Sequence, residues 1–341
     1  MAHFLITGHT GFKGYWLSVL LRSRGHSVSG LSLSAQPDSL YSRSSQKGDF
    51  VHDLIVDIRD RNRLIRSLRR VAPDYVVHMA AQSLVRKGYK EPNFTYETNV
   101  VGTWNVLAAI DETESVRAAV IVTSDKVYQN IGAKRWFLED DPLGGVDPYS
   151  ASKAMADILS QEYSARLLSK PIGIARAGNV IGAGDMTEDR LFPDLIRSAR
   201  ANTSIRLRYP DAVRPWQHVL DCLQGYLLLI EFVEARGSSA PYNFGPPPAT
   251  VASVRNVVGL AFQLLGRDPE LVEYETPTLH EDSVLLVDAS RARLELGWQD
   301  RFTLEQSVED ALFDALDTDG LPIREHIESA IGDWERAKGK L

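Results

Sequence analysis

Two short stretches of the chain carry residue types that can move protons. The string TSDKVY follows the apolar run AAVIV, so Ser124, Asp125 and Lys126 come directly after a predicted buried strand. The string YSASK places Tyr149 and Lys153 at i and i+4 of a predicted helix, where both side chains lie on one face. A tyrosine normally loses its proton at about pH 10, and a nearby ammonium stabilises the phenolate. The pair could supply a base for oxidation of a hydroxyl group, but the same spacing is common on helix surfaces, and the prediction depends on the glycine loop, Ser124 and Pro148 that accompany it.

Asp125 and Lys126 put an acid and an amine side by side where that strand ends. Such a pair can be a structural salt bridge in a turn, or it can face a site in which protons are moved. A lysine with its ordinary pKa of about 10.4 is a poor base, and its ammonium holds a neighbouring acid as carboxylate. A closed site in which the two share one proton resolves this conflict. Both interpretations stay open on these two residues alone.

A glycine-rich loop lies between the first predicted strand and the first predicted helix. In TGHTGFKG, Gly8, Gly11 and Gly14 let the backbone turn tightly and come close to a pyrophosphate, whose charge the helix N-terminus favours. Because the loop opens an alternating chain, it predicts a dinucleotide site more strongly than a plain strand–helix turn. The residues expected to hold the cofactor here are Gly8, Thr10, Gly11, Phe12, Lys13 and Gly14.

Two further predicted strands end beside the expected cofactor. VDIRD supplies Asp57 and Ile58, and Asp57 can accept a hydrogen bond from an adenine amino group or can cap the next helix. HMAAQ supplies Ala80 and Ala81. The second predicted strand ends in GLSLS, with neither an acid for a free ribose hydroxyl nor an arginine for a 2′-phosphate. The residue that usually separates NAD from NADP is therefore silent in this sequence, and NADP is not excluded.

The elements that must position these residues alternate between short apolar runs and amphipathic stretches. Runs that are apolar on both faces, such as HFLIT, DYVVHMA and RAAVIVTS, predict a parallel sheet covered on both sides. Right-handed crossovers make this a doubly wound α/β sheet of the Rossmann type. The segment 38–50 is expected to be a mobile loop.

After about residue 180 the alternation ends, and the chain becomes richer in proline, glycine and charge. The helix predicted over DCLQGYLLLIEFVEAR is apolar enough to pack back on the first sheet. We therefore expect residues 1–179 plus 219–244 to form the dinucleotide-binding domain. Residues 180–218 plus 245–341 are expected to form a smaller mixed substrate-binding lobe.

Composition excludes several classes of protein. A net charge of −7 argues against binding to nucleic acid, and the single cysteine, Cys222, excludes an internal disulfide. No apolar run approaches the roughly 18 residues of a membrane span, and the first residues already form a strand, which leaves no room for a signal peptide. The histidines have no metal-ligand spacing, so no metal site is expected. These features indicate a cytoplasmic protein.

Taken together, the glycine loop, Ser124, Tyr149 and Lys153 resemble the extended short-chain dehydrogenase/reductases that act on nucleotide sugars. The strings TGHTGFKGYWLS, HMAAQSLVR, TSDKVY, EDDPLGGVDPYSASK, ARAGNVIGAGD, DRLFPD and RPWQHV narrow the resemblance to the CDP-glucose 4,6-dehydratase group, from residue 7 to about 226. The resemblance implies tightly held NAD, a nucleotide-sugar substrate and a homodimer formed by pairs of helices.

The resemblance also assigns roles. Ser124, Tyr149 and Lys153 would serve oxidation at C4 of the sugar, and Asp125 and Lys126 would serve elimination of water across C5 and C6. Dehydratases acting on dTDP-glucose have glutamate in place of Lys126, whereas lysine is characteristic of the CDP-glucose group. The resulting hypothesis makes Lys126 the base toward C5 and Asp125 the acid toward the 6-hydroxyl. The product would be a 4-keto-6-deoxy sugar.

The expected substrate-binding residues follow the same strings. Arg214 and Arg190 are the leading ligands for a diphosphate, because a guanidinium binds phosphate oxygens in a fork. Asn99 is expected to order the site by bending a helix. The complete expected set is Gln82, Arg86, Asn99, Asn179, Arg190, Leu191, Tyr209, Arg214 and His218.

Two other functions remain as alternatives. A 4-epimerase or decarboxylase on the same scaffold would share the oxidation residues, but the matching positions of an epimerase usually carry small or hydroxyl residues instead of Asp125 and Lys126. A regulator that senses the dinucleotide without catalysis would typically lose Tyr149 or Lys153, and this chain keeps both.

Overall fold

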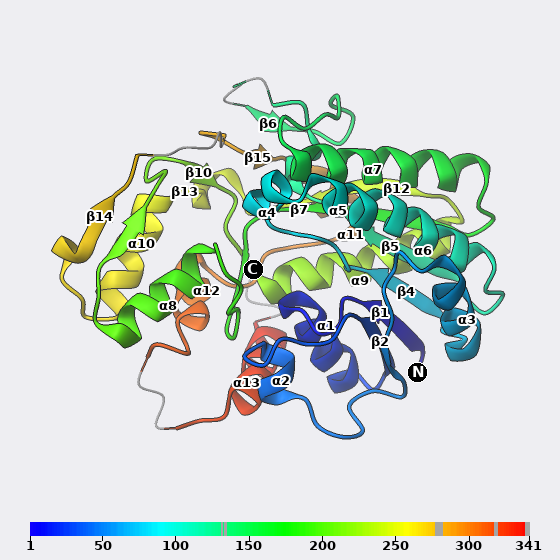
Figure 1. Cartoon of the computed structure of the whole chain (residues 1–341), viewed down its shortest axis with the longest axis horizontal. Helices are drawn as coiled ribbons and strands as arrows, with labels where there is room; N and C mark the ends of the chain where they lie inside the picture. Colours follow the sequence, from blue (N-terminus) through cyan, green and yellow to red (C-terminus); the bar gives the residue numbers. More distant parts are fainter. Residues whose placement is uncertain (131, 133–134, 277–281, 317–319, 338–341) are drawn as a thin grey trace.

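The computed structural model describes residues 1–130, 132, 135–276, 282–316 and 320–337 (Figure 1). Its centre is a sheet of seven strands in the order β12-β7-β5-β4-β1-β2-β3, and every neighbouring pair is parallel. The strands are β1 (His3–Thr7), β2 (Ser27–Ser32), β3 (Asp53–Ile55), β4 (Tyr75–His78), β5 (Ala118–Val122), β7 (Ile172–Ala177) and β12 (Ala240–Phe244). The predicted doubly wound sheet is confirmed.

The strands form where they do because both of their faces are apolar. In β1, Phe4 and Ile6 join the core on one side of the sheet, and Leu5 between them joins the core on the other. Successive side chains of a strand point to opposite faces, so a short run of consecutive apolar residues supplies both cores. This arrangement leaves the carboxyl ends of the strands along one edge, where chemistry in such folds is located.

Helices cover both faces of the sheet (Figure 1). One face packs against α1 and α9, and the other against α3 and α6, with α7 beside them. Their bounds are α1 (Phe12–Ser23), α3 (Arg61–Val71), α6 (Gly102–Asp111), α7 (Pro148–Arg166) and α9 (Val219–Arg236). As expected, α9 packs back on this sheet. Shorter helices α4 (Val85–Lys90) and α5 (Pro92–Tyr96) precede a π-helical turn, Glu97–Val101, which runs directly into α6.

The second lobe, at the left of Figure 1, has a separate core. Apolar side chains from helices α8, α10 and α12 meet Trp216 and two residues of β9, Ile205 and Leu207. The helices are α8 (Leu191–Ala201), α10 (Val254–Leu264) and α12 (Leu304–Ala311). The small strand pairs are β9 (Ile205–Leu207) with β14 (Val272–Tyr274), β10 (Val213–Arg214) with β13 (Ala252–Ser253), β8 (Val180–Ile181) with β11 (Gln217–His218), and β6 (Trp136–Phe137) with β15 (Leu286–Val287).

Packing near the C-terminus differs from the expected division, which put all of residues 245–341 in the second lobe. Helices α11 (Ser290–Leu296) and α13 (Ile323–Arg336) contribute to the core beside the sheet, not to that of the second lobe. In α13, Ile323, Ile327, Ile331 and Trp334 lie on one helical face and pack in the same core as α1. The amphipathic pattern shows that this face is apolar, but it carries no information about which partner covers it.

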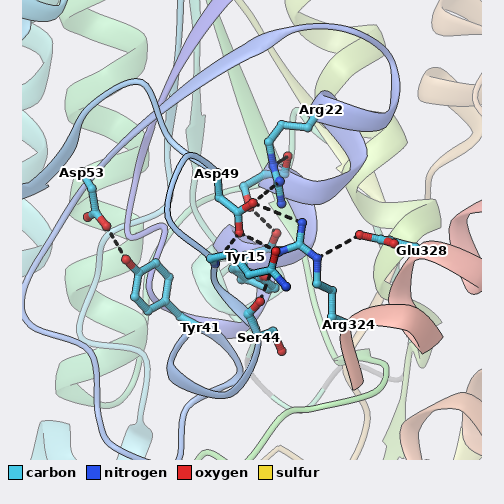
Figure 2. A network of polar contacts seen from close by, with 10 residues as sticks. Tyr15, Arg22, Tyr41, Ser44, Asp49, Asp53, Arg324 and Glu328 are labelled. Atoms are coloured by element: carbon cyan, nitrogen blue, oxygen red, sulfur yellow. Dashed lines mark hydrogen bonds and ion pairs between the residues drawn. The ribbon is translucent and has the colours of Figure 1, made fainter. Parts of the chain in front are cut away.

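The segment 38–50 also differs from the expected mobile loop. It contains helix α2 (Leu40–Ser44) and the buried residue Asp49. Figure 2 shows Asp49 between two arginines, and its carboxylate accepts from Arg22 of α1 at 2.5 Å and from Arg324 of α13 at 2.9 Å. The segment is therefore tied to the first helix of the sheet domain and to α13 at once. Among the described residues, no helix is both long and apolar enough to cross a membrane.

Candidate active site

A cavity of about 400 Å³ lies between the carboxyl ends of β4, β5 and β7 and the second lobe. All five residues expected to be catalytic line it, together with eight of those expected to bind cofactor or substrate. The predicted residues on its wall are Lys13, Ala81, Arg86, Ser124, Asp125, Lys126, Tyr149, Lys153, Asn179, Arg190, Leu191, Tyr209 and Arg214. Residues from distant parts of the sequence thus meet at one crevice.

Tyr149 and Lys153 are positioned by the first turn of α7. Pro148 occupies the first helical position, and the carboxylate of Asp147 caps the helix by accepting from the backbone N–H of Tyr149 at 2.9 Å and of Ser150 at 3.0 Å. The i, i+4 spacing then directs Tyr149 and Lys153 into the same cavity. The Nζ of Lys153 donates to the carbonyl of Val122, the last residue of β5, at 2.9 Å.

The charges of this pair differ from the simple expectation that the Lys153 ammonium lowers the pKa of Tyr149. Burial raises the pKa of the Tyr149 phenol, a hydrogen bond with Ser124 opposes that shift, and the Asp125 carboxylate adds to it. Burial also lowers the pKa of Lys153 to about 7, and the Lys13 ammonium contributes in the same direction. Lys153 can therefore exchange a proton near neutral pH.

Asp125 combines burial with an unpartnered oxygen. Its side chain is 3% exposed, and Oδ1 accepts from the Ser124 hydroxyl at 3.0 Å. Oδ2 has no hydrogen-bond partner among the described residues. Burial raises the pKa of Asp125, against the lowering effect of the Lys126 charge. A protonated carboxyl with a free oxygen in a cavity can donate its proton to a bound hydroxyl group.

Lys126 lines the same cavity and is half-buried. Within the part of the chain that the structure describes, its ammonium forms no ion pair with Asp125, because no such contact falls within 4.0 Å. The structural salt bridge considered from the sequence is therefore not formed, and a proton shared between the two groups in a closed site stays a prediction. Both side chains line the same cavity.

The glycine loop has the geometry of a dinucleotide cradle. Gly8 has a φ of +79°, and a Cβ there would lie 2.8 Å from the backbone nitrogen of Ala80. A Cβ on Gly14 would lie 2.2 Å from the carbonyl oxygen of Gly8. The N-terminus of α1 has no side-chain cap and no acid in its first turn. Its backbone N–H groups and dipole therefore suit an anionic pyrophosphate, and the residues present fit the expected cofactor.

The other expected cofactor residues lie along the same edge of the sheet. Thr10 forms a hydrogen bond with Ser32 at the end of β2 at 2.8 Å, which fixes the glycine loop there. Asp57 follows β3 and accepts from the guanidinium of Arg59 at 2.7 Å, and this hydrogen bond lowers its pKa. Ile58 is buried beside α6, and its carbonyl accepts from Asn105. Contacts of Asp57 or Ile58 with an adenine stay predictions.

Cations and amides gather on the second-lobe side of the cavity. Arg214 is buried at 3% exposure on β10, and its Nη1 donates to the carbonyl of Val213. Asn179 has a φ of +32°, an uncommon backbone conformation that asparagine tolerates better than most residues. Arg190 reaches the hydroxyl of Ser83 at 3.4 Å. These groups have the chemistry to bind a diphosphate.

Three residues expected to bind substrate do not line the cavity. The side-chain amide of Gln82 forms hydrogen bonds with the backbone of Leu84 and the hydroxyl of Thr95. The side-chain amide of Asn99 forms hydrogen bonds with the backbone of Gln82 and the hydroxyl of Ser152. His218 is 1% exposed, with one ring nitrogen paired to Asp310 at 3.0 Å and the other facing the N–H of Leu220 at 3.2 Å. The π-helical turn around Asn99 agrees with the expected bend.

The sequence did not predict two charged residues that line the cavity, Arg208 and Asp189. Arg208 lines the cavity and lies 4.0 Å from the carboxylate of Asp189, which also accepts from Arg86 at 3.1 Å. Asp189 has a φ of +58°. The only sequence signal for Arg208 was its position next to Tyr209. Among the described residues, no cluster of histidine, cysteine, aspartate and glutamate could hold a metal ion.

Comparison with known proteins identifies a matching family and similar individual proteins. Residues 4–245 match the NAD dependent epimerase/dehydratase family. The CDP-glucose 4,6-dehydratase of Salmonella typhimurium (strain LT2) is 38% identical over 316 residues, which cover 89% of this chain and 87% of that protein.

Two solved structures show the same fold. The UDP-glucose 4-epimerase from Brucella ovis in complex with NAD has a TM-score of 0.80 at 22% identity, and the match covers 93% of this chain and 99% of that one. The dTDP-glucose 4,6-dehydratase from Bacillus anthracis str. Ames in complex with NAD has a TM-score of 0.78 at 24% identity, with coverage of 92% and 96%. An epimerase and a dehydratase thus share this fold, so the site residues must distinguish the two reactions.

Proposed function

The chain belongs to the NAD dependent epimerase/dehydratase family, and from that premise we propose that it is an NAD-dependent nucleotide-sugar 4,6-dehydratase that acts on CDP-glucose. The observation that carries the proposal is the presence of Asp125 and Lys126 on the wall of the cavity that also holds Tyr149 and Lys153. An epimerase needs only oxidation at C4 and its reversal, so an acid and an amine would have no task there. The name of the Salmonella relative supports CDP-glucose as substrate.

Oxidation at C4 is the task of Tyr149, Lys153 and Ser124. The phenolate of Tyr149 accepts the proton of the sugar's 4-hydroxyl, and Ser124, which lines the same cavity, orients that hydroxyl. Lys153, with a pKa of about 7, passes the proton onward. When bound, NAD⁺ supplies the oxidant for C4 and, in its reduced form, the reductant for C6. The backbone of the glycine loop would hold its pyrophosphate.

Elimination of water is the task of Asp125 and Lys126. The ketone at C4 makes the hydrogen on C5 acidic, and Lys126 removes it as a proton. Asp125, whose pKa burial raises, donates a proton to the 6-hydroxyl, which leaves as water. Both side chains line one cavity, as groups that act on neighbouring carbons of one hexose must. The product is CDP-4-keto-6-deoxyglucose.

The decisive experiment compares Lys126→Met and Asp125→Asn with the parent enzyme. Each variant is incubated with CDP-glucose in deuterated water, and deuterium at C5 and the 4-keto product are followed by mass spectrometry. We expect K126M to abolish exchange at C5 and D125N to slow loss of water by at least about 100-fold. Parental turnover in both variants would remove the proposal. A parallel screen with GDP-, UDP- and dTDP-linked glucose tests the choice of nucleotide.

The screen also separates the alternatives. Epimerised sugar without a 4-keto product would favour the 4-epimerase. Bound NAD without any change in a sugar would favour the dinucleotide-sensing regulator. The presence of both Tyr149 and Lys153 in the cavity argues against such a regulator.

We also propose a cytoplasmic homodimer. Helices α6 and α7 lie beside each other (Figure 1). Trp104 of α6 and Val101 of the turn before it are exposed to solvent, as are Met155 and Ile158 of α7, and the exposed fraction of each of these residues is between 42% and 51%. An exposed apolar surface on two adjacent helices suits a second copy of the chain. Light scattering tests this, because Trp104→Glu should halve the mass of a dimer, while the control Leu294→Glu, at an 86% exposed position, should not.

A further inference from the structure

A buried ion pair joins α7 to β7 beside residues that line the cavity. Nη2 and Nε of Arg176 donate to Oδ1 and Oδ2 of Asp157, each at 2.8 Å. The side chain of Arg176 is 1% exposed and that of Asp157 is fully buried. Neither residue lines the cavity itself, although Ala177, which follows Arg176, does. The pair can therefore act on a bound sugar only through other residues.

The ion pair contacts the chain on both sides of residues 124–126, which carry the acid and the amine proposed to eliminate water. On one side, the hydroxyl of Thr123 donates to Oδ2 of Asp157 at 2.9 Å. On the other side, Nη1 of Arg176 donates to the hydroxyl oxygen of Tyr128 at 2.9 Å. A single ion pair thus holds this segment at both of its ends.

Both of these attachment points are buried. Thr123 is 5% exposed and Tyr128 is 2% exposed. The ring of Tyr128 stacks on Phe137, with the ring centroids 5.0 Å apart, and its hydroxyl donates to Oδ1 of Asn243 at 2.6 Å. Hydrogen bonds between buried groups are stronger than those in water, so the two ends of the segment have little freedom to move.

Asp157 also lies on the face of α7 that carries the oxidation residues. Tyr149, Lys153 and Asp157 follow one another at intervals of four in this helix, so their side chains share one face. The hydrogen bond from Thr123 to Asp157 therefore connects that face of α7 to the residue directly before Ser124. The groups for oxidation and the groups for elimination are linked through this contact.

We propose that Asp157 and Arg176 are positioning residues for the elimination of water: the ion pair holds residues 124–126 in register with the oxidation residues of α7. This inference rests on the proposed function, because it assigns the pair a task in that reaction. A sugar oxidised at C4 must present C5 and C6 to the second set of groups while it stays bound. The relative placement of the two sets therefore matters more for elimination than for oxidation.

The hydroxyl groups of Thr123 and Tyr128 are the points at which the ion pair can be disconnected from the segment. Removing Asp157 or Arg176 would leave the other charge buried and unpaired, and such a variant can fail to fold. Thr123→Val and Tyr128→Phe keep the approximate shape of each side chain and leave the ion pair intact. Nη1 of Arg176 also keeps a partner in Y128F, because it donates to the carbonyl of Glu139 at 2.7 Å. The double variant T123V/Y128F disconnects both ends.

Matched controls make the same chemical changes away from the cavity. Thr113→Val removes a buried hydroxyl that donates to the carbonyl of Ala109 at 2.7 Å. Tyr75→Phe removes a hydroxyl that donates to Glu234 at 2.7 Å, and neither Thr113 nor Tyr75 lines the cavity. Thr123→Ser keeps the hydroxyl and is the conservative variant that should restore the parental behaviour.

The first readout separates the two steps within one turnover. Single turnovers of the NAD-loaded enzyme with CDP-glucose are followed by the absorbance of reduced nicotinamide, which reports oxidation, and by rapid-quench mass spectrometry, which reports loss of water. Both steps occur on bound sugar, so a change in affinity does not alter the ratio of their rates. We expect elimination to slow at least about tenfold more than oxidation in T123V/Y128F. The ratio should stay within about twofold of the parent in T123S, T113V and Y75F. An unchanged ratio in the folded double variant overturns the inference, because a merely structural defect slows both steps together.

The second readout needs neither substrate nor cofactor. Hydrogen–deuterium exchange of residues 120–129 in the free protein should be at least about tenfold faster in T123V/Y128F than in the parent, and unchanged in T113V and Y75F. Parental exchange of this segment in the double variant overturns the inference even when the parent enzyme makes the 4-keto product. Absence of that product in the parent overturns the proposed function instead.

Discussion

Gly178 offers a direct test of where the proton donor must lie. A Cβ at this position would be 1.7 Å from Oδ2 and 2.2 Å from Cγ of Asp125. Ordinary van der Waals contact begins at 3.4 Å, so the Asp125 carboxyl must move by about 1.7 Å in Gly178→Ala. The side chain is buried and its Oδ1 is held by Ser124, so a movement of this size takes the carboxyl out of its present position.

The size of the effect follows from that displacement. A misplacement of about 1 Å of a reacting group can reduce a rate by about 100-fold, or about 2.7 kcal/mol. We therefore expect G178A to slow elimination of water at least about 100-fold. Oxidation at C4 depends on Tyr149 and Lys153 and should slow less than about tenfold. The additional methyl group should also lower the stability by about 1–3 kcal/mol.

The assay is rapid-quench mass spectrometry with CDP-glucose in deuterated water, combined with a thermal melt of each variant. Gly259→Ala is the matched control, because a Cβ on Gly259 in α10 has no heavy atom within 4 Å. D125N provides the comparison for a lost proton donor, and G178A added to it should have little further effect on elimination. A folded G178A variant that eliminates water at the parental rate would refute the assignment of Asp125 as the acid.

Two further outcomes can be checked with simple variants. Gly14→Ala places a Cβ 2.2 Å from the carbonyl oxygen of Gly8, so the backbone of the glycine loop must shift. We therefore expect the Kd for NAD, measured by equilibrium dialysis, to rise at least about tenfold. An unchanged Kd would contradict the role of the glycine loop in binding NAD. Burial alone would raise the pKa of Asp49, but hydrogen bonds from Arg324 and Gln46 and the charges of Arg22 and Arg324 lower it below its usual value. This carboxylate therefore stabilises the fold above about pH 4 and loses its contribution as the pH falls through its lowered pKa. Asp49→Asn should lower the free energy of unfolding by roughly 2 kcal/mol at pH 7. In thermal melts at a series of pH values, the melting temperature of the variant should fall less between pH 7 and acid pH than that of the parent. An unchanged melting temperature at pH 7 would show that the network in Figure 2 contributes little to stability.

Much of the site could be predicted because local patterns fix it. The glycine loop, the proline at the start of α7 and the i, i+4 spacing of Tyr149 and Lys153 act within a few residues, and each has a direct geometric meaning. The motif strings likewise led to the family that the comparisons confirmed. Sequence alone could therefore predict which of these residues meet in the cavity.

The remainder depended on partners far away in the chain. Gln82, Asn99 and His218 have polar side chains that the fold satisfies internally, and no local pattern distinguishes them from residues that face a ligand. The contact of Lys13 with Tyr226 arises only when α1 and α9 come together. The sign of the pKa shift of Tyr149 was missed for the same reason, since burial is a property of the whole fold.

The packing of α13 against the sheet domain affects the order in which the chain can mature. The core that begins with Phe4 is completed by Trp334, whose indole N–H donates to Asp221 of α9 at 2.7 Å. A nascent polypeptide that has emerged only as far as β12 has already made every strand of the central sheet and the helices α1 and α9 on one of its faces, yet the side of α1 that packs against α13 is still uncovered. Intermediates that end before α13 therefore expose apolar surface of α1 that the complete chain buries, and exposed surface of this kind favours aggregation.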